Sequence, residues 1–252
     1  MRFDKRVAVV TGGSQGIGEA AARVLAREGA SVAVLASSSV EKAQRVAASL
    51  PGQARAYAAD VRDGAALRRV IDAVRADYGR IDILVNSAGV FYPTPVGETD
   101  DDAYDRTMDI NVKGTWNAIG AVAATMKAAR YGKIVNVASV CGMTALGGYA
   151  VYSASKAAVI MMTRALTQEL SPHGINVNVV APGNTETPMN HDIRTKPELK
   201  PFLDAMAART PSGQTYSSAE DIANIIAFLA SDAARAMHGS CVLADEGFSS
   251  VL

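Results

Sequence analysis

Short apolar segments alternate with longer Ala-rich amphipathic segments along the 252 residues of the chain, and this order limits the possible folds most strongly. Segments such as Val7-Ala8-Val9-Val10 are apolar throughout, which is typical of a strand covered on both faces. Strands that alternate with helices form parallel sheets through right-handed crossovers. The sequence therefore predicts a single α/β domain over residues 1–252, built on a doubly wound, Rossmann-type parallel sheet of about seven strands flanked by helices.

The same alternation gives a residue range for each expected element. We expect strands over Val7–Thr11, Val32–Ala36, Arg55–Ala59, Ile83–Asn86, Ile134–Ser139, Ile175–Ala181 and Cys241–Ala244. We expect helices over Gly16–Glu28, Val40–Ser49, Ala65–Tyr78, Ala103–Arg130, Val151–Leu170 and Ala219–Ser231. Residues 184–218 contain four prolines, which interrupt long helices, and we expect this segment to be a functional lid.

Composition excludes several classes of function. The chain has 25 basic and 25 acidic residues, so it has no net charge that would indicate nucleic acid or an anionic membrane as a partner. Two cysteines and three scattered histidines are too few for a disulfide framework or a metal site. No apolar stretch has the length of a signal peptide core or a membrane span. We expect a cytoplasmic protein without a bound metal.

The sequence from Val9 to Gly18, VVTGGSQGIG, has two interpretations. It contains G-x-S-x-G, the nucleophile elbow of serine hydrolases, in which Ser14 would be the nucleophile. It also joins a predicted strand to a predicted helix, where glycines allow backbone N–H groups to approach the pyrophosphate of a dinucleotide. An elbow does not need Gly18, so we favour the phosphate turn. The predicted cofactor contacts here are Gly12, Ser14, Gln15, Gly16, Ile17 and Gly18.

The end of the second predicted strand is where dinucleotide-binding sheets distinguish NAD(H) from NADP(H). An acid usually binds the ribose hydroxyls of NAD at this point, but the sequence here is Ala36-Ser37-Ser38-Ser39. Hydroxyl groups, with Lys42 nearby, could bind a 2′-phosphate instead. We therefore expect NADP(H) to be preferred, with NAD(H) as the alternative. The expected contacts are Ala36, Ser37, Ser38, Asp60 and Val61, although the serines and Asp60 could also serve only as turn residues.

Four polar residues that are far apart in the sequence form a candidate catalytic set. Tyr152 and Lys156 are four residues apart at the start of a predicted helix, so they share one face. Ser139 ends a predicted strand, and Asn111 lies within the helix expected over Ala103–Arg130. Each residue alone has an ordinary explanation in packing, capping or solvation. Together they predict one site, because their roles are complementary.

These residues and their order resemble the short-chain dehydrogenase/reductase family over essentially the whole chain. The matching motifs are Thr11-Gly12-x-x-x-Gly16-x-Gly18, Asn86-Ser87-Ala88-Gly89, Asn111, Ser139, Tyr152-x-x-x-Lys156 and Pro182-Gly183. The resemblance implies hydride transfer between a nicotinamide cofactor and a ketone or secondary alcohol. It further implies cofactor contacts by Asn86, Ala88, Gly89, Tyr152, Lys156, Pro182, Gly183 and Thr187.

The resemblance also implies a role for each catalytic residue. Tyr152 would be the general acid for reduction and the base for oxidation, with a pKa lowered by Lys156 and by an oxidised nicotinamide. Lys156 would also hold the nicotinamide ribose, Ser139 would bind the substrate oxygen, and Asn111 would hold a water on the proton path. Three places depart from the common family pattern. Ser87 replaces a frequent second Asn, Asn184-Thr185 stands where an apolar residue is common after Pro-Gly, and Asp245-Glu246-Gly247 replaces a frequent Asp-Gly-Gly.

The substrate remains open between several classes. The residues expected near the chemistry are mostly apolar or aromatic and suit an apolar or modestly polar ketone or alcohol. The candidate substrate contacts are Ser139, Cys141, Leu146, Tyr149, Tyr152 and Met189, with Phe91 among the neighbouring apolar residues. The nearest subgroup is the 3-oxoacyl-thioester reductases; a phosphorylated carrier could meet basic residues in His191–Lys196 or at Lys127 and Arg130, unless these are simply solvated.

Other interpretations stay open at this point. One is an NAD-dependent dehydrogenase of a small alcohol, sugar or cyclic alcohol, and another is a non-catalytic nucleotide-binding subunit. Ser153–Lys156 also fits S-x-x-K, but the companion motifs of penicillin-binding enzymes are absent. The predicted helices Ala103–Arg130 and Val151–Leu170 are apolar around much of their circumference. Because relatives pair these helices between subunits, we expect a homotetramer or homodimer.

Overall fold

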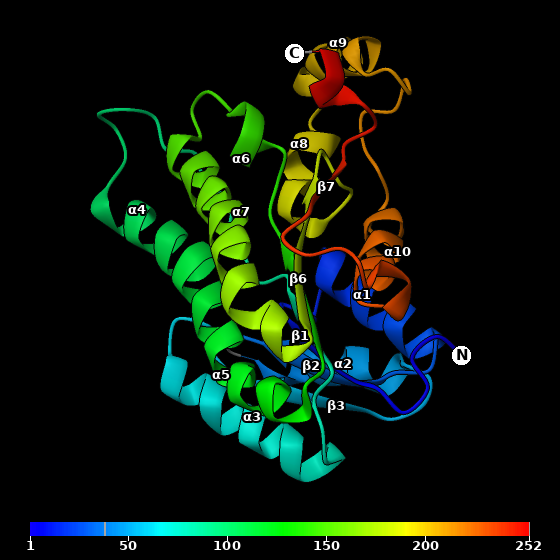
Figure 1. Cartoon of the computed structure of the whole chain (residues 1–252). Coiled ribbons are helices and arrows are strands. Elements are labelled where there is room, and N and C mark those ends of the chain that lie inside the picture. The colour runs from blue at the N-terminus through cyan, green and yellow to red at the C-terminus, as the bar shows by residue number, and fades with distance from the viewer. Residues whose placement is uncertain (38, 252) are drawn as a thin grey trace.

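Seven parallel strands form one sheet at the centre of the computed structural model, which describes residues 1–37 and 39–251 (Figure 1). The strand order is β3-β2-β1-β4-β5-β6-β7, and all six neighbouring pairs are parallel. The strands are β1 (Val7–Thr11), β2 (Ser31–Ala36), β3 (Ala54–Ala58), β4 (Ile83–Asn86), β5 (Gly132–Val137), β6 (Ile175–Pro182) and β7 (Cys241–Ala244). The predicted doubly wound fold is confirmed, with strand ends shifted by at most two residues.

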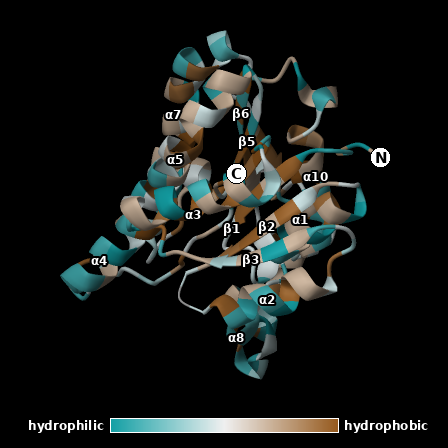
Figure 2. Ribbon diagram, turned by 90° about the horizontal axis from the view of Figure 1, so that it is seen from below, coloured by the Kyte–Doolittle hydropathy of each residue, from teal (hydrophilic) through white to brown (hydrophobic). Residues whose placement is uncertain are grey.

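Both faces of the sheet are covered, which explains why its central strands are apolar without alternation. In β1, Ala8 and Val10 belong to one core cluster, while Val7 and Val9 belong to the other, because successive side chains point to opposite faces. The first face carries α1 (Gly16–Arg27), α2 (Val40–Ser49) and α10 (Ala219–Leu229), and the second carries α3 (Gly64–Tyr78), α5 (Gly114–Ala129) and α7 (Ala150–Leu170). Figure 2 shows the hydrophobic strands between these two layers.

The long helix expected over Ala103–Arg130 is not regular throughout, and that part of the prediction is wrong. It consists of α4 (Asp101–Met108), a π-helical segment η1 (Asp109–Lys113) and α5. The N–H of Gly114 donates to the carbonyl of Asp109, five residues earlier, which defines the wider turn. Asn111 lies inside this π-helical segment and is bonded to another part of the chain, a contact that sequence periodicity does not reveal.

The segment predicted as a lid is more helical than its prolines suggested. It contains η3 (Pro188–Asn190), α8 (His191–Thr195), η4 (Pro197–Leu199) and α9 (Lys200–Arg209). Pro188, Pro197 and Pro201 stand in the first turn of three of these elements, where the absent N–H group breaks no helical bond. The prolines therefore start short helices as well as end them.

The remaining short elements are α6 (Cys141–Thr144), η2 (Ser171–His173), η5 (Asp232–Ala234) and η6 (Phe248–Val251). Of the helices in the described part of the chain, none combines the length and apolar character needed to cross a membrane. The strand order reverses between β1 and β4, and ligands of open α/β sheets bind beyond the carboxyl ends of the strands at such a point. The structure has a cavity of about 1010 Å³ there.

Candidate active site

The glycine turn between β1 and α1 forms one wall of the large cavity. Gly12 and Gly16 have φ values of +64° and +57°, a region that L side chains rarely adopt. A Cβ on Gly12 would lie 2.8 Å from the backbone of Ala88, and one on Gly18 would collide with the backbone of Gly12. The turn therefore brings backbone and the N-terminus of α1 to the cavity wall, an arrangement that fits the diphosphate of a dinucleotide.

Most of the predicted cofactor residues meet at this cavity. Those that line it are Gly12, Ser14, Gln15, Gly16, Ile17, Ala36, Ser37, Asp60, Val61, Ala88, Gly89, Tyr152, Lys156, Pro182, Gly183 and Thr187. Gly18 and Asn86 do not line it. Gly18 packs behind the turn, and the buried Asn86 donates from Nδ2 to Oδ1 of Asn136 at 2.8 Å, between β4 and β5. Ser38 lies outside the described residues.

Three of the four predicted catalytic residues line the same cavity from two elements. Ser139 follows β5, and Tyr152 and Lys156 lie one turn apart on α7. The ammonium of Lys156 lies 5.6 Å from the centroid of the Tyr152 ring and donates to the carbonyl of Val137 at 3.1 Å. The hydroxyl of Ser139 accepts from the backbone N–H of Cys141 at 3.2 Å. A hydroxyl, a phenol and an ammonium thus converge on one space.

Burial shifts the pKa values of the two titratable groups in opposite directions. It raises the pKa of the Tyr152 phenol well above its usual value, an effect that a hydrogen bond with Ser139 only partly opposes. It lowers the pKa of the Lys156 ammonium to about 8. Without a cofactor the pKa of Tyr152 is thus raised, because loss of water around the phenolate outweighs the hydrogen bond with Ser139. The lowered pKa expected beside an oxidised nicotinamide stays a prediction.

Asn111 does not line the cavity and instead ties three segments together. Its Oδ1 accepts from the N–H of Val90 at 2.9 Å, and its Nδ2 donates to the carbonyl of Val90 at 3.1 Å and to Oγ of Ser155 at 3.0 Å. The absence of a side chain at Gly89 leaves room for Asn111 and Lys156. A Cβ on Gly89 would lie 3.2 Å from Oδ1 of Asn111 and 3.5 Å from Nζ of Lys156. Ser155 was not identified from the sequence, since nothing local marks it as the partner of Asn111.

Aromatic side chains form the wall next to Tyr152. The ring of Phe91 stacks on Tyr149, with centroids 4.2 Å apart and planes 3° apart, and meets the ring of Tyr152 edge to face at 4.7 Å. The other predicted substrate residues, Cys141, Leu146 and Met189, line the same cavity. Sequence reasoning missed the lining residues Arg106, Met206, Arg209, Tyr216 and Phe248, because no motif marks them.

The surroundings of Ser14 do not support a hydrolase site. Ser14 lines the cavity as part of the glycine turn. His238, one of the three histidines that follow Ser14 in the sequence, bonds instead with Ser171 and Asn176 beside the start of β6. The start of β6 lies at the amino ends of the parallel strands, whereas the cavity lies beyond their carboxyl ends. His238 is therefore on the opposite side of the sheet from Ser14.

The glycine turn and the set of Ser139, Tyr152 and Lys156 define a class of nicotinamide-dependent oxidoreductase. The family model for short chain dehydrogenases matches residues 6–198, and the chain belongs to this family. It is therefore an oxidoreductase of the short-chain dehydrogenase/reductase type, which transfers hydride between a nicotinamide cofactor and a ketone or secondary alcohol. The non-catalytic interpretation is not supported.

Relatives with different substrates match the chain over nearly its whole length. It is 35% identical to a 3-oxoacyl-(acyl-carrier-protein) reductase of Thermotoga maritima, over 98% of this chain and 99% of the relative. It is 38% identical to D-threitol dehydrogenase of Mycolicibacterium smegmatis, over 98% and 94% of the two chains. A crystal structure from Sinorhizobium meliloti 1021, described as a candidate short-chain alcohol dehydrogenase, is similar with a TM-score of 0.93, 35% identity and 100% coverage of both chains.

Proposed function

We propose that the enzyme uses NADPH to reduce a ketone with an apolar chain, of the 3-oxoacyl thioester class. The observation that carries this substrate class is the aromatic wall beside Tyr152, where Phe91 and Tyr149 stack. Such a wall stabilises an apolar chain, whereas a polyol would need hydrogen-bonding groups at this position. The similarity to a 3-oxoacyl reductase supports the same class.

In this proposal the four predicted residues act as follows. The hydroxyl of Ser139 donates a hydrogen bond to the ketone oxygen and fixes its orientation. Tyr152 then donates its proton to the same oxygen, and the ammonium of Lys156 favours the phenolate that is left. Asn111 acts at a distance, by holding the π-helical segment against Val90 and Ser155. When bound, the nicotinamide supplies the hydride.

The preference for NADP(H) rests on the charges at the adenosine end of the cavity. Ser37, Ser39 and Lys42 line it near the end of β2. The carboxylate of Asp60, which also lines it, is held by the guanidinium of Arg62 through bonds of 2.7 and 3.0 Å. Because Arg62 is paired with Asp60 and Ser39 donates to the carboxylate of Glu41 at 2.7 Å, we assign the contact with a 2′-phosphate to Lys42.

One experiment tests cofactor and substrate together. The purified enzyme is assayed at the nicotinamide absorbance with acetoacetyl-coenzyme A and NADPH or NADH, and with threitol and NADP⁺ or NAD⁺. We expect thioester reduction with kcat/KM about tenfold higher for NADPH, consistent with one charge-assisted contact. Lys42→Ala should remove most of this preference, whereas Lys113→Ala, a matched control outside the cavity, should not. Threitol oxidation with NAD⁺ and no thioester reduction would replace the proposal by a polyol dehydrogenase.

Of the two basic regions that could bind a phosphorylated carrier, only His191–Lys196 lies near the cavity. Arg130 donates to the carbonyl of Pro172 at 3.2 Å, between the end of α5 and the start of β6. This position is at the amino edge of the sheet, so Lys127 and Arg130 cannot meet a carrier that enters the cavity. In the lid, Arg194 is occupied by Asn190 and the carbonyl of Thr187, which leaves Lys196 and His191 for such a contact.

We also infer a homotetramer, with a homodimer as the alternative. Trp116 on α5 and Met161 on α7 are 54% and 60% exposed, although both are large and apolar. The two helices lie on the same face of the sheet. Light scattering of the purified protein and of Met161→Glu tests this, since the charge should dissociate an interface on these helices. The cytoplasmic location stays a prediction.

A further inference from the structure

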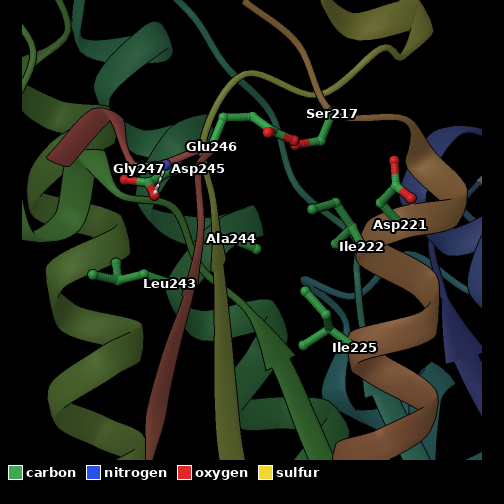
Figure 3. Close-up of a pocket in the computed structure, with 9 residues that line it drawn as sticks. All are labelled: Ser217, Asp221, Ile222, Ile225, Leu243, Ala244, Asp245, Glu246 and Gly247. Carbon is green, nitrogen blue, oxygen red and sulfur yellow. Dashed lines mark hydrogen bonds between the residues drawn. The ribbon is translucent and has the colours of Figure 1, made fainter. Parts of the chain in front are cut away.

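Glu246 is the second residue after the end of β7 and lies in the wall between two cavities. Asp245 and Glu246 line both the large cavity and a second one of about 240 Å³. Figure 3 shows this second cavity, with Ile222 and Ile225 of α10 on one side and the carboxylate of Glu246 beside Ser217 at its upper rim. The common family pattern has glycine at position 246, so a carboxylate here needs its own explanation.

The backbone at Glu246 has a conformation that glycine would adopt more easily. Its φ is +60°, in the left-handed region that residues with a Cβ rarely occupy. The neighbouring turn is supported by Asp245, whose carboxylate accepts from the N–H groups of Gly247 and Ser249 at 3.1 and 2.8 Å. A side chain kept at a strained position indicates a function for that side chain.

The contacts of Glu246 connect it to the arm by which the lid returns to the fold, residues 209–217. Its Oε1 accepts from Oγ of the buried Ser217 at 2.7 Å, and its carbonyl accepts from the N–H of Ser212 at 3.3 Å. Ser217 in turn pairs with the segment by which the chain enters the lid, residues 184–189, which we call the departing arm. The N–H of Ser217 donates to the carbonyl of Asn184, and the carbonyl of Ser217 accepts from the N–H of Glu186. Glu246 therefore holds the point where both arms meet.

The returning arm contributes directly to the wall of the active-site cavity. Arg209, Thr210, Thr215 and Tyr216 line the cavity, and Thr187 and Met189 line it from the departing arm. Ser139 follows β5, and Tyr152 and Lys156 lie on α7, so all three are outside the lid. A residue that holds the returning arm would therefore affect ligand binding more than the chemical step.

We propose that Glu246 is a positioning residue that holds the lid over the cavity through Ser217. The proposal rests on the proposed function only for its kinetic part, since the position of the lid can be measured without a substrate. According to this proposal, the side chain of Glu246 contributes to substrate affinity. The glycine of the common Asp-Gly-Gly motif could not make this contribution.

The test compares Glu246→Ala, Ser217→Ala, the double variant and Glu246→Gln. We expect each alanine variant to raise the KM of the ketone about tenfold, the effect of one charge-assisted hydrogen bond, with kcat within about twofold of the parent. The double variant should be no worse than either single variant, because both remove the same bond. Glu246→Gln keeps an acceptor oxygen and should lie between the parent and Glu246→Ala.

Ser218→Ala is the matched control, because Ser218 is the neighbouring hydroxyl but caps α10 through Asp221 instead of meeting Glu246. It should leave KM unchanged. Limited tryptic cleavage within the lid, at Arg194 and Arg209, gives a second measurement that needs no activity; Lys196 and Lys200 precede prolines and are not cut. Cleavage should be faster in Glu246→Ala and Ser217→Ala than in Ser218→Ala.

Three results would overturn the proposal. One is equal cleavage rates in Ser217→Ala and the control. Another is a double variant whose KM change is the product of the single changes. A third is a KM change in Glu246→Gln as large as in Glu246→Ala while Ser217→Ala matches the parent, since the carboxylate would then contact the ligand itself. If no substrate is turned over, the proposed function fails, but the cleavage rates still decide the lid proposal.

Discussion

Two buried lysines stand at opposite edges of the same sheet, and their surroundings differ. Lys133, at the start of β5, is 3% exposed, donates to Oδ1 of Asn176 at 2.8 Å and lies 3.3 Å from a carboxylate oxygen of Asp232. Lys156, at the carboxyl edge, is 6% exposed and has only a carbonyl oxygen, that of Val137, as a hydrogen-bond acceptor among the described residues.

The difference separates a structural lysine from a functional one. Burial of an ammonium is unfavourable unless a carboxylate or other acceptors compensate it. Lys133 has that compensation, so its charge contributes to the fold. Lys156 lacks a carboxylate partner and faces the cavity with its pKa lowered to about 8, which is the pattern of an active-site group. The following predictions test this contrast.

The largest effect should come from Tyr152→Phe at the carboxyl edge. Removing the hydroxyl removes the only proposed proton donor at the substrate oxygen, so kcat should fall roughly 10³-fold. Phe91 would still pack against the ring, so the fold should be retained. Steady-state rates, with circular dichroism as the control for folding, measure this. Near-full activity would show that another group transfers the proton.

The stability of the protein without cofactor should depend on pH through Lys156. Its pKa is about 8 when folded and about 10.4 when unfolded, so below pH 8 both states are protonated and the full burial penalty applies. Between these values the folded state releases its proton first, and the free energy of unfolding rises with pH by about 3 kcal/mol. Urea unfolding at pH 7 and pH 10 should show Lys156→Met more stable than the parent at pH 7, by a margin that shrinks at pH 10. A margin independent of pH would contradict this.

Lys156→Met should also lower activity without unfolding the protein. The phenolate of Tyr152 would lose its neighbouring cation, and kcat/KM should fall roughly 100-fold, equivalent to about 2.7 kcal/mol. Assays across pH should show a greater loss for alcohol oxidation, which needs the phenolate, than for ketone reduction. Equal rates in the variant and the parent would show that Lys156, like Lys133, has a structural role only.

The opposite result is expected for Lys133→Met. Oδ1 of Asn176 would lose its donor in a buried position, so the free energy of unfolding should fall by about 1–2 kcal/mol. The specific activity of the folded fraction should not change, because this edge lies away from the cavity. Lys113→Met, an exposed lysine, is the control, with an expected change below about 0.5 kcal/mol. A loss of activity in Lys133→Met at unchanged stability would contradict the assignment of Lys133 as a structural residue.

The sequence was sufficient for features that depend on local spacing. Strand and helix alternation predicted the sheet, and the four-residue separation of Tyr152 and Lys156 predicted their shared face. Features that depend on folding were missed, such as the stack of Phe91 on Tyr149 and the bond of Glu246 to Ser217. Burial, which raises the pKa of Tyr152 in the protein without cofactor, is another feature that spacing does not reveal.

The π-helical segment η1 also has a geometrical consequence for the helices on either side of it. A π turn contains one more residue than an α turn, and one residue corresponds to about 100° of rotation around a helix axis. Residues of α4 and α5 therefore do not share a single angular phase. Deleting one residue from Asp109–Lys113 would restore a uniform helix but turn α4 by that angle relative to α5. The extra residue thus sets the phase between the two helices, and with it the direction in which each of them faces.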